Sequence, residues 1–335
     1  GISREIRTWD NAATMAPRAL ASLAQEKTQP TSMALRVVPK LLYGAGHAYG
    51  QPLTGTGTEA TLAALTREDL ARFHADWFRP NHATVIVVGP VTVASLTPQL
   101  ERLLRNWQPG EIPAKAIATV APRPSRTLYL LDRPGADQSV IFAGQLIPSR
   151  ATPDDLAIAT MNDVLGGKFT ARLNMNLREA KHWSYGAYSF SYDARGQRPL
   201  LAYAPVQSDK TAEAVTEIRN EFASIVGKRP ATPDEVALVK RTNTLSLPGQ
   251  WETGGAVVSS ISEIVEFGLP DDYWSRYATS IRNLTPEQVN KAARDNLRPE
   301  DLILVVVGDR KVIEPGLRSL GFDAIQLVNA DGDLL

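Results

Sequence analysis

The spacing of apolar residues alternates between helical and strand periods along this chain. Helical spacing predicts helices over residues 11–27, 32–42, 66–77 and 95–106, which are rich in Ala, Leu, Met and Glu. Between the last two, residues 83–89 form a run of β-branched side chains that is typical of a strand buried on both faces. The first third of the chain is therefore predicted to be helical, with one buried strand.

A proline-rich stretch at residues 108–126 interrupts the pattern and is predicted to be a linker. Beyond it, the short apolar runs and the alternating segments become more frequent. Strands are predicted at residues 127–132, 139–145, 184–192, 200–206 and 302–308, and further helices at 208–226, from 232 and from 285.

Part of the first pattern returns in the second. Aligning Leu65 with Leu284 gives an offset of 219 (284 − 65), and the same offset matches Arg79-Pro80 with Arg298-Pro299. The valine-rich strand that follows each Arg-Pro pair also matches, and no gap is needed. A helix, an Arg-Pro break and a valine strand recurring in one register predict two copies of one fold.

The repeat defines the expected domain organisation. We predict an incomplete first module at residues 1–107, a linker at 108–126 and a second module at 127–335. The second copy begins near residue 127, and 127 − 219 is −92, so the first copy is expected to begin about ninety residues before Gly1.

Composition narrows the classes of function. The chain has 335 residues, and its 36 basic and 36 acidic residues cancel, which argues against a nucleic acid partner. It has no cysteine, which excludes disulfides and cysteine-bound zinc. No apolar run approaches the roughly 18 residues of a membrane span, so none is predicted. These features leave the compartment undecided.

Residues 152–192 contain the most informative stretch. Thr152 is predicted as the N-cap of a helix with Pro153 at its first position, and Gly166 is predicted to end that helix. The pair Gly166-Gly167 is expected to form a left-handed turn that lets a second helix, over residues 169–181, start at a new angle. A strand then follows from Ser184.

Arg178 and Tyr185 lie seven residues apart on either side of the turn from this second helix into the strand. Alternation along the strand directs Tyr185 away from the aromatic stripe of Tyr188, Phe190 and Tyr192. Both side chains donate hydrogen bonds, and two converging donors suit a carbonyl oxygen or an oxyanion. The alternative is a surface arginine packed over a half-buried tyrosine.

Three segments carry a resemblance to a known family: residues 41–50 (Leu-Leu-Tyr-Gly-Ala-Gly-His-Ala-Tyr-Gly), 65–89 and 173–185. The chain resembles the M16 family of zinc metallopeptidases, the pitrilysin, insulinase and mitochondrial-processing-peptidase group, and especially its bacterial two-module members. The resemblance implies an α+β fold of repeated modules, each an antiparallel-rich sheet packed by helices, as in LuxS/MPP-like metallohydrolases. Residues 173–185 resemble the signature of the module often described as inactive.

The resemblance also implies roles for particular residues. In the family, an arginine and a tyrosine seven residues apart hydrogen-bond the substrate backbone near the scissile bond, and Arg178 and Tyr185 match these positions. His182 and Trp183 lie between them and are candidates for lining a substrate groove, with a half-buried turn as the alternative.

The zinc motif of the family, His-x-x-Glu-His, is absent from the sequence. We therefore expect no catalytic residue and no bound cofactor in this chain alone, and we expect zinc in a complementary module or partner. Glu26 falls near the place of the family's third zinc ligand; it is either a remnant of that ligand or an ordinary carboxylate on a helix surface.

These features lead to three hypotheses. The first is a peptidase portion that binds a peptide or small-protein substrate for a zinc-bearing M16 module or subunit, within a hetero- or homo-oligomer. The second is a scaffold without catalysis, and the third is a peptide-binding module without chemistry. The resemblance to bacterial members favours the periplasm as the location.

Overall fold

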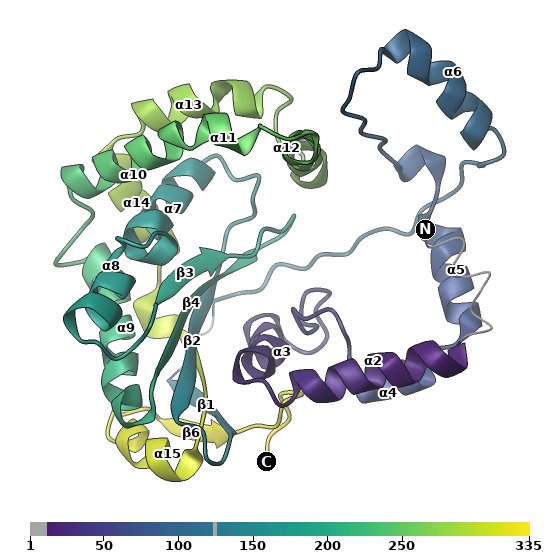
Figure 1. The fold of residues 1–335 in the computed structure, drawn as a ribbon. Helices are drawn as coiled ribbons and strands as arrows, with labels where there is room; N and C mark the ends of the chain where they lie inside the picture. The colour runs from purple at the N-terminus through teal and green to yellow at the C-terminus, as the bar shows by residue number, and fades with distance from the viewer. Residues whose placement is uncertain (1–11, 123–125) are drawn as a thin grey trace. The chain divides into compact units, whose positions relative to one another are not determined.

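The computed structural model describes residues 12–122 and 126–335, which divide into two compact units (Figure 1). The smaller unit comprises residues 12–23, 58–116 and 245–274. The larger comprises residues 24–57, 117–244 and 275–335. The start of the predicted first helix, Asn11, and residues 123–125 of the predicted linker lie outside the described residues. The module boundaries expected at residues 107 and 126 were derived from the sequence repeat, and they stay a prediction.

The larger unit is built on a six-stranded mixed sheet with the strand order β3-β4-β2-β5-β1-β6. β5 pairs in parallel with β1 and antiparallel with β2, and the pairs of β2 with β4 and of β3 with β4 are antiparallel. The sheet and its helices confirm the predicted fold class. The strands are β1 (Thr127–Asp132), β2 (Gln138–Ile147), β3 (Tyr188–Ser191), β4 (Arg198–Gln207), β5 (Ile303–Gly308) and β6 (Ala324–Leu327).

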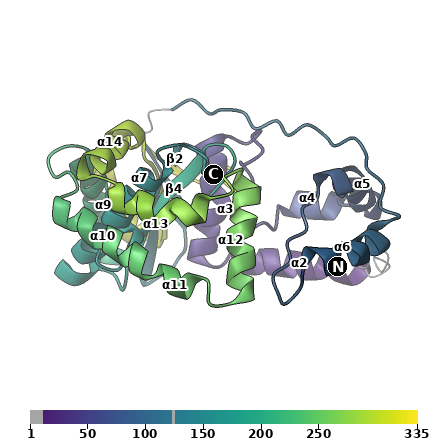
Figure 2. The same cartoon turned by 90° about the horizontal axis from the view of Figure 1, so that it is seen from above.

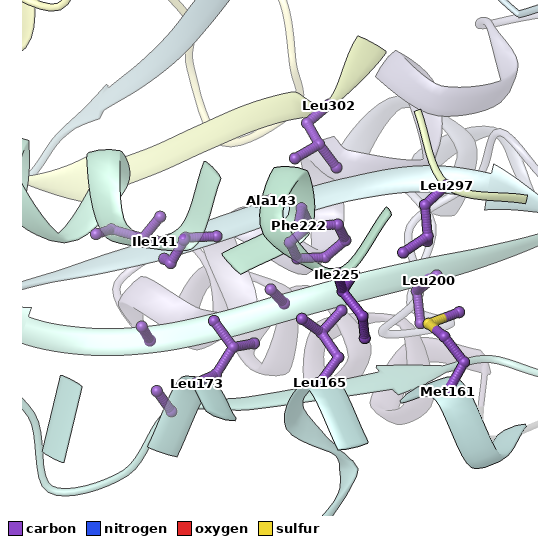
Figure 3. Packing of buried hydrophobic residues seen from close by; sticks show 14 of the residues in the cluster. Ile141, Ala143, Met161, Leu165, Leu173, Leu200, Phe222, Ile225, Leu297 and Leu302 are labelled. Carbon is purple, nitrogen blue, oxygen red and sulfur yellow. The ribbon is translucent and has the colours of Figure 1, made fainter. Parts of the chain in front are cut away.

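One face of this sheet carries a layer of helices and the main core. Apolar side chains of the strands, such as Ile141 and Leu200, pack there against Met161, Leu165 and Phe222 from the helices (Figure 3). The elements outside the sheet in this part of the chain are α7 (Asp155–Asn162), the π-helix η3 (Asp163–Gly167), α8 (Arg172–Asn174), the π-helix η4 (Met175–Ala180), the 3-10 helix η5 (Ser208–Lys210), α9 (Thr211–Val226), α10 (Pro233–Leu245), α13 (Tyr273–Asn283), α14 (Pro286–Asn296), the 3-10 helix η6 (Pro299–Asp301) and α15 (Arg310–Arg318).

The opposite face of the sheet is covered by α3 (Pro30–Tyr43), as Figures 1 and 2 both show. Val37 and Val38 of α3 are buried against Phe142, Val305 and other strand residues in a second apolar cluster. A helix from the first part of the chain therefore completes the core of a sheet formed by the second part.

The smaller unit contains only helices as regular structure within the described residues. Its elements are α4 (Glu59–Ala64), α5 (Arg67–Trp77), the 3-10 helix η2 (Pro80–His82), α6 (Val93–Leu104), α11 (Leu247–Gln250) and α12 (Gly254–Phe267), and α2 (Ala12–Glu26) runs from this unit into the larger one. Across both units, no helix in the described part of the chain is long and apolar enough to span a membrane.

Helix boundaries reproduce the sequence repeat to the residue. Adding 219 to the bounds of α5, 67 and 77, gives 286 and 296, the bounds of α14. The same offset takes η2 onto η6. Thr66 and Thr285 each form a capping box at the start of these helices, so the local hydrogen bonding also repeats.

The prediction of a strand at residues 83–89 is wrong. These residues are irregular and mostly exposed. The exposed fraction is 54% for Val85 and 47% for Val87, against 1% and 0% for their repeat counterparts Leu304 and Val306. β5 is a strand because it has neighbours on both sides, whereas residues 83–88 pair with no strand in the described part of the chain. Apolar sequence alone does not make a strand without a partner.

The predicted boundaries around residues 152–192 also need correction. The helix starts at Asp155 with Asp154 as N-cap, not Thr152. The second helix covers residues 172–180 instead of 169–181, and the strand begins at Tyr188 instead of Ser184. The reason for the shorter strand is that residues 184–187 are held by side chains and turns, as described below.

Gly166 and Gly167 do not form the left-handed turn that the sequence predicted. Neither has a positive φ angle, and the helical turn continues through both as η3. A Cβ atom on Gly166 would lie 2.4 Å from Ser189 Oγ and 2.5 Å from Ser189 N, and one on Gly167 would lie 2.5 Å from Asp163 Oδ1. Glycine is needed here because η3 lies directly against β3.

Gly166→Ala is expected to destabilise the fold by about 1–3 kcal/mol, since the added methyl group would push η3 away from the Ser189 backbone. Denaturant unfolding measures the effect. Gly255→Ala is the matched control, because that helical glycine has open space around its Cβ position, and alanine there should be neutral or stabilising. Equal stability of both variants with the parent would contradict the close packing.

Candidate functional site

Arg178 is carried by a short helix that widens into a π-helical turn. α8 continues into η4 without a break, and Leu173 and Leu177 are buried beneath the two turns. Single π-helical turns within helices are frequent at functional sites. Arg178 lies near the end of this turn, as the sequence predicted.

The helix ends at Ala180, and His182 follows it with a φ angle of 57°. His182 is the single left-handed residue other than glycine in the described part of the chain. The Trp183 N–H donates to the Leu177 carbonyl at 2.9 Å, and the His182 N–H donates to the Arg178 carbonyl at 3.1 Å. These bonds close the helix around a left-handed residue, in the way that C-terminal caps do. The left-handed residue of this segment is therefore His182, after the second helix, and not the glycine pair before it.

The segment from Trp183 to Ala187 is fixed to the molecule by hydrogen bonds. The Gln207 N–H donates to the Trp183 carbonyl at 3.0 Å, and the Ser184 hydroxyl lies 2.5 Å from the Pro205 carbonyl. At the other end, the Ala187 N–H donates to Asn174 Oδ1 at 3.2 Å. The backbone on both sides of Tyr185 is thus held in place by β4 and by the helix that carries Arg178.

Tyr185 itself points to solvent. Its exposed fraction is 85%, and its hydroxyl has no hydrogen-bond partner among the described residues. The Arg178 guanidinium is half-buried, lies over the Phe169 ring at 4.6 Å and is 3.4 Å from the Glu179 carboxylate. The structure thus brings both donors to one fixed helix end, and their convergence on one substrate atom stays a prediction.

The two residues between the donors differ in environment. His182 is exposed, whereas Trp183 is half-buried, packs against the main core and has the Lys181 ammonium 4.8 Å from its ring centroid. These contacts give Trp183 a packing role. The groove-lining role of either residue stays a prediction.

The described residues do not fit a catalytic zinc ion. They contain no group of three or more His, Cys, Asp or Glu side chains able to hold a metal. Glu26, the predicted remnant ligand, accepts hydrogen bonds from Arg36 at 3.1 Å and Thr56 at 2.7 Å. Its carboxylate is engaged in an ion pair with a buried arginine, and a role in metal binding stays a prediction.

The remaining histidines lie in separate aromatic contacts. His47 stacks on Tyr43 with ring centroids 4.8 Å apart, and His74 stacks on Phe78 at the same distance. His82 lies 6.4 Å from the ring of Trp77. Each of these imidazole rings lies beside a neighbouring aromatic ring, which gives the three histidines a packing role.

Sequence reasoning missed the asparagines that support the site. Asn174 is fully buried, accepts from the Ala187 N–H and donates to the Phe169 carbonyl at 2.7 Å. Asn162 binds both the hydroxyl and the carbonyl of Ser189. The available signal was an asparagine in the middle of each predicted helix, where this residue is unfavourable without a specific partner.

Arg172 anchors the start of the same helix. Its guanidinium binds Glu235 through two hydrogen bonds, of 2.7 and 2.6 Å, and also the carbonyl groups of Arg229 and Pro230. Burial raises the pKa of Glu235, but hydrogen bonds from Arg172 and Thr232 outweigh burial, so the pKa lies below its ordinary value.

Glu235→Ala is expected to cost about 2 kcal/mol of unfolding free energy near pH 7, because it leaves the buried Arg172 without its charged partner. A lowered pKa in the folded state means that this stabilisation is present above the ordinary pKa of about 4.3 and is lost as the pH falls through the folded value. The difference in unfolding free energy between the parent and the variant should therefore decrease below about pH 4, as measured by denaturant unfolding curves. Glu213→Ala, at an exposed glutamate, is the control and should change little.

The sequence of this chain is similar to those of known proteins. A family model described as the peptidase M16 inactive domain matches residues 64–243, more than half of the chain. An uncharacterized zinc protease of Mycobacterium leprae is 27% identical over 186 residues, 54% of this chain and 40% of its own length. One of Streptomyces coelicolor is 26% identical over 308 residues, 87% of this chain and 63% of its own length. The chain thus spans less than two thirds of these relatives.

Solved structures show the same fold. The peptidase M16 inactive domain from Pseudomonas fluorescens superposes with a TM-score of 0.82 at 23% identity, covering 89% of this chain and 70% of that one. The periplasmic protease PqqL from Escherichia coli gives 0.68 at 17% identity, covering 88% of this chain and 32% of that one. Complex III from Candida albicans contains a chain with a TM-score of 0.74 at 15% identity, and the match covers 90% of this chain and 73% of that one.

Proposed function

Because the chain belongs to the family of the peptidase M16 inactive domain, we propose that it is the substrate-holding portion of a zinc metallopeptidase. Its curated relatives are named zinc proteases, and the described residues do not fit a zinc ion. The proposed partner is a zinc-bearing M16 module or subunit, whose metal would activate water for hydrolysis. This chain would contribute binding and orientation of the peptide.

The single observation that supports the proposal is the state of Tyr185. A tyrosine that is 85% exposed, on a backbone fixed at both ends, contributes little to folding, and its hydroxyl has no partner among the described residues. A hydroxyl without an internal partner breaks no hydrogen bond of the described residues when it receives an acceptor. Arg178, at the end of the adjoining helix, supplies the second donor, and both would bind a peptide carbonyl near the scissile bond.

The way in which the peptide binds follows from the edge of the sheet. β3 is an edge strand, and side chains bind the backbone in and just before it: Asn162 binds the Ser189 carbonyl, and Asn174 binds the N–H of Ala187, which precedes β3. Side chains that occupy an edge in this way oppose the addition of another strand. We therefore expect the peptide to take hydrogen bonds from the two donors of this chain and its strand pairing, if any, from the zinc-bearing module.

A scaffold role is the second candidate, and one comparison favours it: a chain of the Candida albicans complex III has the same fold. A scaffold has no use for an exposed tyrosine hydroxyl near a half-buried arginine at the surface, so Tyr185 and Arg178 favour the peptidase role. The periplasmic location of PqqL supports a periplasmic location here.

Reconstitution tests the proposal. The chain alone is expected to hold no stoichiometric zinc and to cleave no peptide, whereas its titration into a zinc-bearing M16 module should raise cleavage of a fluorogenic peptide to a plateau. One tightly held zinc per chain in elemental analysis, with activity lost on chelation, would contradict the proposal. A cleavage rate independent of the added chain would favour the scaffold.

A further inference from the structure

Phe169 lies in the turn between η3 and α8, and its ring is the surface on which the Arg178 guanidinium rests. The guanidinium carbon lies 4.6 Å from the centroid of the ring. The other charged group near this guanidinium among the described residues is the exposed carboxylate of Glu179, at 3.4 Å. Of these two contacts, the one with Phe169 joins Arg178 to a segment outside its own helix.

The kind of contact matters for what Arg178 is able to bind. A cation over the face of an aromatic ring is attracted by the electrons of the ring, and this contact uses none of the five N–H donors of the guanidinium. An ion pair, by contrast, occupies donors. No hydrogen bond joins the Arg178 side chain to another of the described residues. Stacking thus restrains the guanidinium while its donors stay available to a substrate.

The backbone that carries the Phe169 ring is itself fixed. Asn174 Nδ2 donates to the Phe169 carbonyl at 2.7 Å, and the Ala171 N–H donates to the Lys168 carbonyl at 3.0 Å. The Lys168 ammonium lies 3.4 Å from the Asp163 carboxylate of η3. Because Asn174 is fully buried, the turn is anchored in the interior although the ring is exposed.

The same asparagine also fixes the segment that carries Tyr185. Asn174 Oδ1 accepts from the N–H of Ala187, two residues after Tyr185, at 3.2 Å. One buried amide therefore sets the position of the ring beneath Arg178 and the position of the backbone next to Tyr185. The place of Phe169 thus determines where one donor lies relative to the other.

We propose that Phe169 is a positioning residue for Arg178, whose ring orients the guanidinium without occupying the N–H donors that bind the substrate carbonyl. The inference rests on the proposed function in naming that carbonyl as the acceptor. The restraint of Arg178 by the ring is a property of this chain alone. The usual strength of an exposed contact between a cation and an aromatic ring corresponds to a factor of about two to five in a rate or an equilibrium.

Nuclear magnetic resonance of the chain alone tests the restraint. The probe is the Nε–Hε group of Arg178, assigned by its disappearance in Arg178→Lys, and its order parameter is measured by ¹⁵N relaxation. Phe169→Leu should lower the order parameter to the value of the exposed Arg294, because leucine has no aromatic face, and Phe169→Tyr should retain it. Phe73→Leu is the matched control, since its exposed fraction is 56% against 54% or more for an exposed Phe169, and should leave the order parameter unchanged.

Kinetics of the reconstituted peptidase separate positioning from direct contact between the ring and the substrate. Phe169→Leu should lower kcat/KM about two- to fivefold, and Phe169→Tyr should keep the parental value. In the Arg178→Ala background, Phe169→Leu should cost nothing further, because a positioning residue acts only through the residue that it holds. Melting of the chain should be the same in all Phe169 variants, since the ring is exposed.

Two results would overturn the inference. One is an Arg178 order parameter that Phe169→Leu leaves unchanged, which would show that the ring does not restrain the guanidinium. The other is a loss in kcat/KM that persists in the Arg178→Ala background, which would show that the ring contacts the substrate itself. Parental kinetics of Arg178→Ala would contradict the proposed function instead, and the order parameters would still decide whether Phe169 orients Arg178.

Discussion

Tyr185→Phe and Arg178→Ala are each expected to lower the turnover of the reconstituted peptidase by about 10²- to 10³-fold while the fold stays intact. The reason is the loss of one of two fixed donors to a carbonyl that becomes an oxyanion during hydrolysis. The fold should be unaffected because the Tyr185 hydroxyl has no partner among the described residues and Arg178 makes only surface contacts. Steady-state kinetics with a fluorogenic peptide measures the effect.

The split between kinetic constants identifies the state in which the donors act. A loss mainly in kcat indicates bonds that strengthen in the transition state, whereas a loss mainly in KM indicates that the pair only holds the substrate. Tyr188→Phe, at a neighbouring surface tyrosine, and Arg294→Ala, at an exposed arginine of α14, are the matched controls and should retain parental rates. Parental turnover in both test variants would make the pair structural and remove the holding role.

Asp155→Ala is expected to cost about 3–5 kcal/mol of unfolding free energy, the largest stability effect that the structure predicts. The Asp155 carboxylate binds Arg150 with one oxygen and Arg198 with the other, and both arginines are nearly fully buried. Arg198 also donates to the Pro148 carbonyl at 3.1 Å. Removing the carboxylate leaves two buried cations that share the less buried Asp193 as an acidic partner.

Chemical denaturation of the larger unit measures this cost. Asp209→Ala removes an exposed carboxylate whose ion-pair partner among the described residues is the neighbouring Lys210, and it should change stability by less than about 0.5 kcal/mol. A loss for Asp155→Ala as small as that of the control would show that the network contributes nothing to folding. The same outcome would mean that the ion pairs of Asp155 with Arg150 and Arg198 do not stabilise the start of α7.

The repeat and the strands β1, β2, β4 and β5 followed from the sequence because their determinants are local and dense, whereas β6 was not predicted and β3 begins later than predicted. Residues 127–132 were predicted and observed as β1 with the same bounds, since a short apolar run flanked by proline and glycine residues has few alternatives. Residues 83–89 carry an equally strong strand pattern and are irregular, because a strand exists only with neighbours. The sequence pattern thus indicates which secondary structure a segment favours, and the neighbouring strands determine whether that structure forms.

The glycine pair and the candidate site show what the sequence could not predict, because their structure depends on residues far away along the chain. Gly166 has a role that depends on Ser189, which lies 23 residues further along the chain (189 − 166), so no local rule could separate close packing from a left-handed turn. Arg178 and Tyr185 were predicted as site residues from their spacing and from the resemblance, and their role stays a prediction. The asparagines that fix them were missed because Asn162 and Asn174 act through contacts with distant backbone, which residue type alone does not indicate.

The most direct test of the account measures the substrate carbonyl itself. A slowly cleaved peptide carrying a ¹³C label at the scissile carbonyl is bound to the reconstituted peptidase, and its stretching frequency is read by isotope-edited infrared spectroscopy. Two donors from this chain should lower the frequency relative to the free peptide, and Tyr185→Phe should return part of that shift while Tyr188→Phe returns none. An identical frequency in the parental and Tyr185→Phe complexes would contradict the claim that this chain holds the carbonyl.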